Sequence, residues 1–257
     1  MKNAIIVFFH AIKFSIALLS RQKEKEIETL LIPYILSEGD IAVDVGANGA
    51  NWTYLLSKQV GKKGKIFAFE ADPYYSRVTK ETIKLLRLNN VILFPYGLGS
   101  GSKTVNLKVF SENNTRFSGE GYITDENNVA NSSMSVSIQI KGLDSLVKNH
   151  PLISSASFIK CDTEGYELFV FQGAESLLKT SRPIIVLETG HSNRYGYTNK
   201  DLYDFFKSFE YVAFIMGDDM MLTEADEDLS PTYVRRNRVL IPLEKLDLVT
   251  KLKNQHF

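Results

Sequence analysis

The sequence has one cysteine, Cys161, no excess of charge of either sign, and no apolar run that is both long and uncharged. A single cysteine excludes an intrachain disulfide and a metal site built from several cysteines, and it is typical of the reducing cytoplasm. The 30 basic and 30 acidic residues cancel, so no overall field would attract nucleic acid. These absences predict a cytoplasmic protein that does not bind nucleic acid.

Length and composition fit one globular domain with a short addition. The 257 residues are 44% hydrophobic, which is enough for one full core. We expect an amphipathic helical segment over residues 1–30 and a single α/β domain over residues 31–257. Three Asn-X-Ser/Thr triplets begin at Asn51, Asn113 and Asn131. We interpret them as chance matches, because the sequence gives no clear sign of secretion.

The N-terminal segment stands out by its apolar character. Residues 4–19 are apolar except for His10, Lys13 and Ser15. On a helix, Asn3, His10, Lys13 and Ser20 form one narrow polar stripe and leave a broad apolar face. Such a helix is buried against the domain or a second subunit, lies in a membrane interface, or is a signal or spanning segment. The central charge and the short length argue against a span. We therefore expect residues 4–19 to be buried against the domain, or to make peripheral membrane contact or a homo-oligomer.

The remaining chain alternates between strands and helices. Strands are predicted at 41–45, 66–70, 91–95, 157–161 and 184–187, and helices at 51–60, 74–88, 143–148, 167–179 and 200–208. This alternation is typical of a doubly wound, mostly parallel sheet. Segments 211–215 and 234–241 are expected to close it, with an antiparallel terminal strand. Runs at 103–110 and 134–140 around an Asn/Ser/Gly-rich stretch, 111–133, predict a β-rich insertion.

The junction between strand 41–45 and helix 51–60 is the first candidate site. Its loop is made of small residues that let a ligand approach the backbone, namely Gly46, Ala47, Gly49 and Ala50. Asp44 would repel a pyrophosphate but would pair with a cationic ammonium group, such as that of S-adenosylmethionine (SAM). The three-glycine fingerprint of dinucleotide sites is missing, because Asn48 and Ala50 replace its later glycines.

Glu70 adds a second acid to this candidate site. It ends the next apolar run, where a carboxylate accepts hydrogen bonds from ribose hydroxyls in nucleotide-binding βαβ units. Each acid alone has a simpler interpretation. Asp44, or Asn48 beside it, can cap the helix, and Glu70 can be a solvent-exposed residue at the end of a strand. The pair, separated by a helix-length segment, favours a cofactor site.

A second group of acidic and histidine side chains, which can act in catalysis or bind a metal, follows two central strands. Asp162, Glu164 and Glu167 come after strand 157–161, and Glu188 and His191 come after strand 184–187. Ligands bind at the carboxyl ends of strands in open α/β sheets. The simpler interpretation is that Asp162 caps the next helix while Glu164 and Glu167 complement its dipole.

Several strings in the sequence resemble the FkbM family of SAM-dependent methyltransferases. They are Val43-Asp-Val-Gly-Ala-Asn48, Phe67-Ala-Phe-Glu-Ala-Asp-Pro73, Gly142-Leu-Asp-Ser-Leu146 and Phe158-Ile-Lys-Cys-Asp-Thr-Glu-Gly-Tyr-Glu167 with Gln172-Gly-Ala-Glu-Ser-Leu-Leu178. The resemblance spans about residues 41–188, and its last motif is the most specific. It implies a class I methyltransferase (Rossmann-like) fold, SAM as methyl donor, and O-methylation of a hydroxyl on a sugar, a glycan or a polyketide-type natural product.

The resemblance also implies roles for single residues. Asp44, Gly46 and Asn48 would line the methionine end of SAM, and Glu70 its ribose. We add the neighbouring Ala47, Thr53 and Ala71 to the expected cofactor contacts. Asp162 and Glu164 would stand beside the transferred methyl group. The chain departs from the family pattern at Ala50, which replaces a glycine, at Ala71, which replaces a proline, and at Ser100, which replaces an acid.

The chemistry of methyl transfer leaves two arrangements open. The donor and acceptor must be aligned, and a neutral alcohol must lose its proton. His191 could act as the base, oriented by Asp162 or Glu188. Alternatively, Mg²⁺ or Mn²⁺ between Asp162 and Glu188 would acidify the hydroxyl. The expected catalytic residues are therefore Asp162, His191 and Glu164.

Two other functions stay open at this point. One is a nucleotide-sugar or dinucleotide-using oxidoreductase, and the other is a non-catalytic SAM-fold module at a membrane. The acceptor is expected to be a small molecule or glycan with a free hydroxyl. Segments 111–133 and 191–198 would form its wall, and their polar and aromatic content suits a polyhydroxylated sugar.

Overall fold

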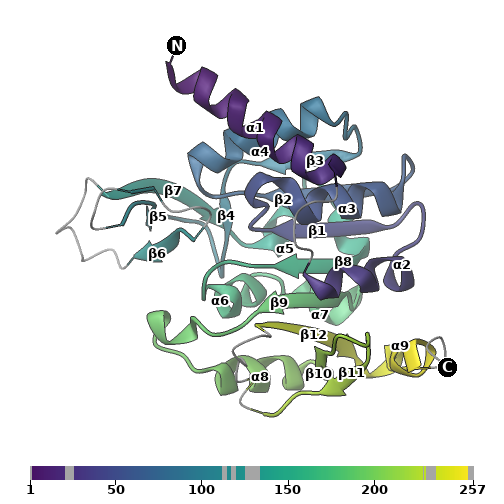
Figure 1. The fold of residues 1–257 in the computed structure, drawn as a ribbon. Coiled ribbons are helices and arrows are strands. Elements are labelled where there is room, and N and C mark those ends of the chain that lie inside the picture. The colour runs from purple at the N-terminus through teal and green to yellow at the C-terminus, as the bar shows by residue number, and fades with distance from the viewer. Residues whose placement is uncertain are drawn as a thin grey trace.

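The structure is a computed structural model that describes residues 2–20, 26–111, 115–116, 120–124, 134–227, 229 and 236–253. Most of the Asn/Ser/Gly-rich stretch 111–133, including Asn113 and Asn131, lies outside the described residues. The chain forms a central sheet with helices on both faces and a small second sheet at one edge (Figure 1).

The central sheet has eight strands in the order β11-β10-β12-β9-β8-β1-β2-β3. Their bounds are Ile41–Val45 (β1), Lys65–Phe69 (β2), Val91–Phe94 (β3), Ala156–Cys161 (β8), Ile184–Glu188 (β9), Tyr211–Met216 (β10), Leu222–Glu224 (β11) and Asn237–Pro242 (β12). Strands β3, β2, β1, β8 and β9 pair in parallel, and β12 pairs antiparallel with β9 and β10. This confirms the doubly wound, mostly parallel sheet with an antiparallel end. The short edge strand β11 was not predicted.

Two layers of helices bury the sheet. One hydrophobic cluster takes side chains from α2 (Ile32–Ile35), α3 (Asn51–Val60), α9 (Asp247–Lys253) and the 3-10 turn η1 (Ile27–Leu31). The other takes side chains from α5 (Leu143–Leu146), α6 (Glu167–Gln172), α7 (Glu175–Thr180) and α8 (Asn199–Ser208). Because both faces are covered, β1 is buried at every position, and its residues are apolar except for Asp44. Further short turns are η2 (Asn48–Ala50), η4 (Pro151–Ser155), η5 (Ser192–Tyr195) and η6 (Leu243–Lys245).

The helix predicted over 167–179 is wrong in one respect, because it is broken into α6 and α7. Gly173 sits at the break, and a Cβ there would lie 2.0 Å from the carbonyl oxygen of Gly99. The Gly173 carbonyl accepts a hydrogen bond from Asp144 N at 2.8 Å, and the Asp144 carboxylate accepts from Ser176 N at 2.8 Å. These contacts with distant segments outweigh local helix propensity.

The second sheet confirms the β-rich insertion. Its strands are β4 (Gly97–Leu98), β7 (Ser135–Lys141), β5 (Lys103–Lys108) and β6 (Tyr122–Thr124), in that spatial order. Strand β6 lies inside the stretch that was expected to be loop, and its sequence Tyr-Ile-Thr consists of residues that favour strands. The insertion stands at the left of Figure 1, away from the antiparallel end of the main sheet.

The N-terminal helix α1 (Lys2–Ser20) packs along α4 (Pro73–Leu85). Val7 and Ala11 meet Val78 of α4 in a small hydrophobic cluster. His10 Nδ1 and the Tyr74 hydroxyl are joined by a hydrogen bond of 2.5 Å. Among the helices of the described residues, none has the length and apolar content that crossing a bilayer requires.

The packing at Gly173 can be tested by adding one methyl group. We expect Gly173→Ala to lower the free energy of unfolding by about 1–3 kcal/mol, since the new Cβ must displace the Gly99 backbone. Gly101→Ala is the matched control, because a Cβ there has no neighbour within 4 Å. Urea denaturation of both variants measures the difference, and equal stabilities would contradict the proposed packing.

Candidate active site

A cavity opens where β1, β2 and β8 end. Its space measures about 920 Å³ when the part open to solvent is included. Of the residues selected from the sequence, the cavity wall contains Gly46, Asn48, Glu70, Ala71, Asp162 and Glu164. Leu107 of β5 and Ile123 of β6 form another part of the wall, so the insertion covers the ends of the central strands.

The loop after β1 is held by backbone contacts to its neighbours. Gly46 N and Ala47 N both donate to the Phe69 carbonyl at 3.0 Å, and Asp162 N donates to the Val45 carbonyl at 3.0 Å. Gly46 has a φ of +85°, and a Cβ there would lie 2.0 Å from the Asp162 carbonyl oxygen. The space that glycine leaves at this position is therefore filled by protein. Gly46 also lines the cavity, and its contact with a cofactor stays a prediction.

Glu70 and Asn48 present polar atoms at the cavity. Glu70 accepts hydrogen bonds from Asn48 N at 2.9 Å and from Asp72 N at 2.8 Å, one on each carboxylate oxygen. Burial raises the pKa of Glu70 to about 7, although these hydrogen bonds oppose the shift. The Asn48 Oδ1 atom is buried and has no hydrogen-bond partner within the described part of the chain. An acceptor left over in this way fits a ligand that brings its own donors.

Asp44 and Thr53 lie beneath the loop and do not line the cavity. The Thr53 hydroxyl donates to Asp44 Oδ2 at 2.5 Å. Burial raises the pKa of Asp44 to about 6, while the Thr53 hydrogen bond and Lys160 lower it. Ala47 is also outside the cavity wall. Contact of these three residues with a cofactor therefore stays a prediction, and what the structure shows is that Asp44 fixes the start of α3.

Glu164, Glu188 and His191 meet at the ends of β8 and β9. One ligand atom from each lies within 4.8 Å of those of the other two. His191 Nε2 is 3.4 Å from Glu164 Oε2, and Arg194 Nη1 is 3.5 Å from the same oxygen. Asp162, which was expected to pair with Glu188, is not in this group. Its carboxylate lies 3.8 Å from Lys160 Nζ instead.

The protonation of this group follows from burial and from neighbouring charges. Burial and the nearby Asp162 raise the pKa of Glu164 to about 7. Burial, Asp162 and Glu164 together raise the pKa of Glu188 well above its ordinary range. Burial and the charges of Arg194 and Arg236 lower the pKa of His191. His191 is therefore neutral near pH 7 and can accept a proton.

The sequence matches the methyltransferase FkbM domain over residues 44–213. The chain belongs to the FkbM family of SAM-dependent methyltransferases. A solved structure of the methyltransferase FkbM from Methylobacillus flagellatus KT is 14% identical, with a TM-score of 0.51, over 80% of this chain and 44% of that one. This chain thus spans less than half of that protein. The likeness supports the class I methyltransferase (Rossmann-like) fold.

A SAM-dependent O-methyltransferase from Thermotoga maritima is 10% identical, with a TM-score of 0.46, over 89% of this chain and 71% of that one. No curated protein matches the sequence. The FkbM domain includes every candidate site residue named above from Asp44 to Arg194, whereas α1 lies before it.

In this FkbM methyltransferase, sequence reasoning missed the role of Lys160. Its side chain in β8 is 1% exposed, and Nζ lies 3.0 Å from Asn237 Oδ1 and 3.5 Å from Glu26 Oε2. Burial lowers the pKa of Lys160, but the charges of Glu26, Asp162 and Glu188 outweigh it, so the pKa lies above its ordinary value. The sequence did contain a signal for this role, namely a lysine inside a strand of apolar residues. A buried cation needs acidic partners, so such a lysine predicts carboxylates nearby.

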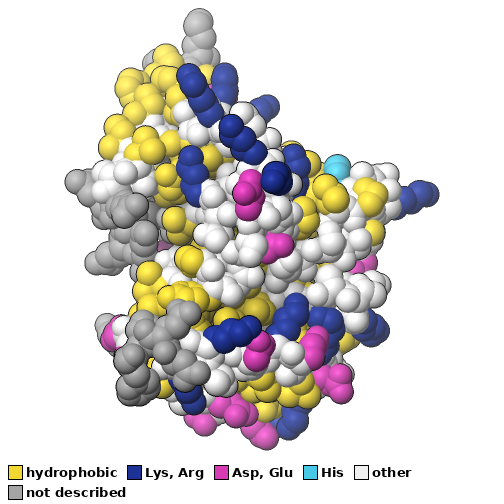
Figure 2. Space-filling model, turned by 90° about the vertical axis from the view of Figure 1, so that its right-hand side faces the viewer, with side chains coloured by type: hydrophobic (Ala, Val, Ile, Leu, Met, Phe, Trp, Pro, Cys, Tyr) yellow, Lys and Arg dark blue, Asp and Glu magenta, His cyan; other side chains and the backbone are white. Residues whose placement is uncertain are grey.

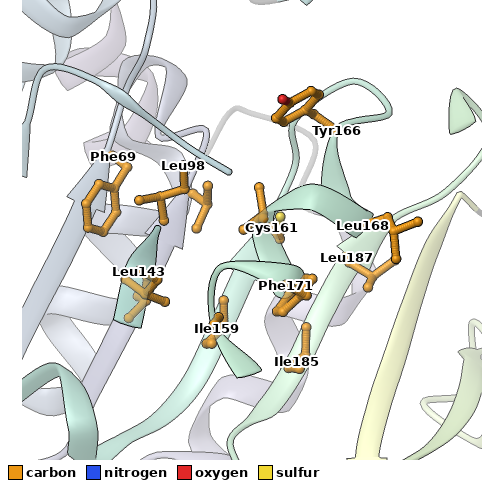
Figure 3. Packing of buried hydrophobic residues seen from close by; sticks show 14 of the residues in the cluster. Phe69, Leu98, Leu143, Ile159, Cys161, Tyr166, Leu168, Phe171, Ile185 and Leu187 are labelled. Carbon is orange, nitrogen blue, oxygen red and sulfur yellow. The ribbon is translucent and has the colours of Figure 1, made fainter. Parts of the chain in front are cut away.

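Tyr166 is a second residue that sequence reasoning missed. It lines the cavity, and its ring packs against Phe169 and Tyr195 with centroids 4.7 and 5.1 Å away. Figure 3 shows Tyr166 at the end of the buried cluster that contains Leu98, Cys161 and Leu168. An aromatic wall of this kind fits a planar or sugar-like ligand.

Glu167 has a structural role in the same turn. Its Oε1 accepts hydrogen bonds from Thr163 N and Thr163 Oγ1, both at 2.9 Å. Glu164 has a φ of +57° and Gly165 a φ of +105°. A Cβ on Gly165 would lie 2.4 Å from the His191 carbonyl oxygen, so this turn brings the loops after β8 and β9 together.

Replacing Lys160 tests how much its charge stabilises the acidic end of the sheet. We expect Lys160→Met to lower the free energy of unfolding by about 1–3 kcal/mol near neutral pH, because it leaves the half-buried Glu26 and Asp162 and the buried Asp44 without a counter-charge. This loss of unfolding free energy should shrink toward about pH 5, because burial raises the pKa of Asp44 to about 6 and its carboxyl is protonated below that pH. Urea denaturation across this range checks the slope. Lys148→Met, at an exposed lysine on the same chain, should cost little at any pH.

Proposed function

We propose that the protein is a SAM-dependent O-methyltransferase that acts on a hydroxyl group of a sugar, a glycan or a glycosylated natural product. One observation carries the proposal. A single cavity runs from Glu70 and Asn48, which suit a nucleoside cofactor, to Glu164, which is in contact with His191. Methyl transfer to an alcohol needs a cofactor site and a proton acceptor. The cavity joins the cofactor end to Glu164, and His191, which is not a residue of the cavity wall, contacts that carboxylate.

The cofactor end holds a nucleoside by hydrogen bonds. Ionised Glu70 has acceptor capacity left after its two backbone hydrogen bonds, and this capacity suits the two ribose hydroxyls. The free Asn48 Oδ1 suits an ammonium or amide donor. SAM, when bound, supplies an electrophilic methyl group. The protein's task is then to position the acceptor oxygen and remove its proton.

His191 is the proposed general base. It is neutral near pH 7 because its pKa is lowered by burial, Arg194 and Arg236. Glu164, 3.4 Å away, orients the ring and stabilises the imidazolium that forms. Asp162 carries negative charge beside the same cavity and is held by Lys160. We assign it the role of holding the acceptor hydroxyl beside the transferred methyl group.

A divalent cation is a second arrangement at the same place. Glu164, Glu188 and His191 provide two carboxylates and an imidazole within 4.8 Å, a ligand set that suits Mn²⁺ or Mg²⁺ together with water. The cation would bind the acceptor hydroxyl and lower its pKa. In that case His191 is a ligand rather than a base, so the two arrangements exclude each other.

The acceptor class rests on the polar and aromatic wall. Tyr75 and Tyr166 offer ring faces, while Glu120 and Thr163 offer hydrogen-bonding groups. The two segments expected to form the wall meet, because the Arg194 guanidinium lies 4.6 Å from the centroid of the Tyr122 ring. Such walls suit a polyhydroxylated ligand. Mass spectrometry of glycans and metabolites from cells with and without the gene would identify the acceptor by the loss of one methyl group.

Family membership favours methyl transfer over the oxidoreductase alternative. Isothermal titration with SAM and with NAD separates the two, since only SAM should bind. Tight SAM binding without turnover on any hydroxyl compound would instead support the non-catalytic module.

Cofactor affinity should depend on pH through Glu70. Its pKa is raised to about 7, so it is ionised above that value and loses its charge below it. We expect SAM binding to weaken as pH falls from about 8 to about 5.5, by up to roughly tenfold per unit for one coupled proton. Glu70→Gln should bind SAM roughly tenfold to a hundredfold more weakly at high pH and show a flatter profile. Titration calorimetry checks both, and an unchanged Glu70→Gln profile would remove Glu70 from the site.

Substitution of His191 or Asp162 should affect turnover and leave cofactor binding largely intact. We expect His191→Ala and Asp162→Asn each to lower the methyl-transfer rate by roughly a hundredfold, while SAM affinity changes little. Glu175→Gln, an exposed carboxylate on α7, serves as the control. Loss of activity with EDTA that Mn²⁺ or Mg²⁺ restores would select the cation, and indifference to EDTA would select His191 as base. Full activity in both variants would reject the assignment.

A further inference from the structure

Helix α1 has two apolar faces, and within the described part of the chain only one of them is covered. The inner face places Val7 and Ala11 against α4 and the Phe14 ring against the cofactor loop, where a Cβ on Gly49 would lie 2.5 Å from that ring. These contacts, with the hydrogen bond between His10 and Tyr74, attach the helix firmly to the domain. The position of the outer face is therefore fixed by the fold.

The outer face is unusually apolar for a surface. Six of the eleven large apolar side chains that are exposed in the described residues belong to α1. Among them Phe9 is 63% exposed, Ile16 59% and Leu19 64%. Ile5, Phe9, Ile16 and Leu19 recur at helical spacing and form one stripe along the helix. A contiguous apolar stripe of this kind marks an interaction surface.

The surroundings of this stripe are basic. Helix α1 contains no acidic residue, and the segment 51–90, which includes α3 and α4, has eight basic residues and three acidic ones. The two helices themselves hold four of these basic residues and one acidic residue, Glu81. The other two acids of the segment, Glu70 and Asp72, are buried. In Figure 2 the apolar side chains gather at the upper left with lysine and arginine side chains beside them, while most acidic side chains of that view lie lower. The neutral chain therefore separates its charge, with the positive side next to α1.

We propose that the outer face of α1 binds the surface of an anionic lipid bilayer. The apolar stripe enters the boundary between headgroups and acyl chains, and the exposed Arg77, Lys80 and Lys84 of α4 contact the phosphates. The helix lies in the interface plane and does not cross it. A second copy of the chain fits this face less well, because pairing would bring two basic surfaces together.

The structure also decides how the proposal should be tested. Removing residues 1–20 would take Phe14 away from Gly49 and disturb the cofactor loop, so deletion confuses binding with folding. Substitutions confined to the outer face avoid this problem. The variant of choice combines Phe9→Gln, Ile16→Gln and Leu19→Gln, since glutamine keeps helix propensity. The control combines Leu152→Gln and Leu243→Gln, two exposed apolar positions away from α1.

Cosedimentation with vesicles of phosphatidylglycerol and phosphatidylcholine tests the proposal. We expect the full chain to bind the mixed vesicles, to bind pure phosphatidylcholine more weakly, and to be released by salt. The outer-face variant should bind at least about tenfold more weakly, and the control should bind like the wild type. A charge variant of α4, Arg77→Gln with Lys80→Gln and Lys84→Gln, should lose the preference for anionic vesicles.

Three results would overturn the proposal. They are no binding of the wild type to mixed vesicles, equal binding by the outer-face variant, or a wild-type dimer that this variant converts to monomer in light scattering. SAM titration on the same samples confirms that the variants are folded. Failure of this proposal leaves the methyltransferase proposal untouched, because none of the substituted residues lines the cavity.

Discussion

The acidic end of the central sheet depends on one buried cation. Asp44, Asp162 and Glu188 lie at the ends of three adjacent strands, and such carboxylates repel each other in a region of low dielectric. Lys160 is placed on the middle strand of the three, and the charges of Glu26, Asp162 and Glu188 keep it ionised. Asn237 holds its ammonium group from β12 at 3.0 Å. These three acids can therefore be close together because a lysine unsuited to a strand interior lies beneath them.

The same end of the sheet is joined by backbone contacts that side chains would prevent. Gly46 lets the loop after β1 touch the Asp162 carbonyl, and Gly165 lets the loop after β8 touch the His191 carbonyl. The three loops thus form one connected layer above Lys160. A shift of any one of them moves the others, which explains why Glu164 and His191 are brought within 3.4 Å although they follow different strands.

Local patterns in the sequence were sufficient where neighbouring residues decide the structure. Strand β1 and helix α3 lie at the predicted bounds, 41–45 and 51–60, because apolar runs and helical periodicity are local signals. The break at Gly173 was not predictable in this way, since it depends on Gly99. The cavity position of Glu70 and Glu164 followed from the rule on strand ends, whereas the buried place of Asp44 did not, because that rule does not say which side of the loop a carboxylate faces.

The loop after β1 shows why a small-residue motif has to be interpreted with care. From the sequence, its glycines predict room for a ligand to approach the backbone. In the structure, the space beside Gly46 is filled by the Asp162 carbonyl and the space beside Gly49 by the Phe14 ring of α1. Ala50 tolerates a φ of 72° that glycine would adopt more easily. Packing alone therefore explains the small residues. The evidence for a cofactor rests on Asn48 and Glu70, two residues of the cavity wall with acceptor capacity to spare. Within the described residues Asn48 Oδ1 has no hydrogen-bond partner, and the Glu70 carboxylate can accept more than its two backbone hydrogen bonds.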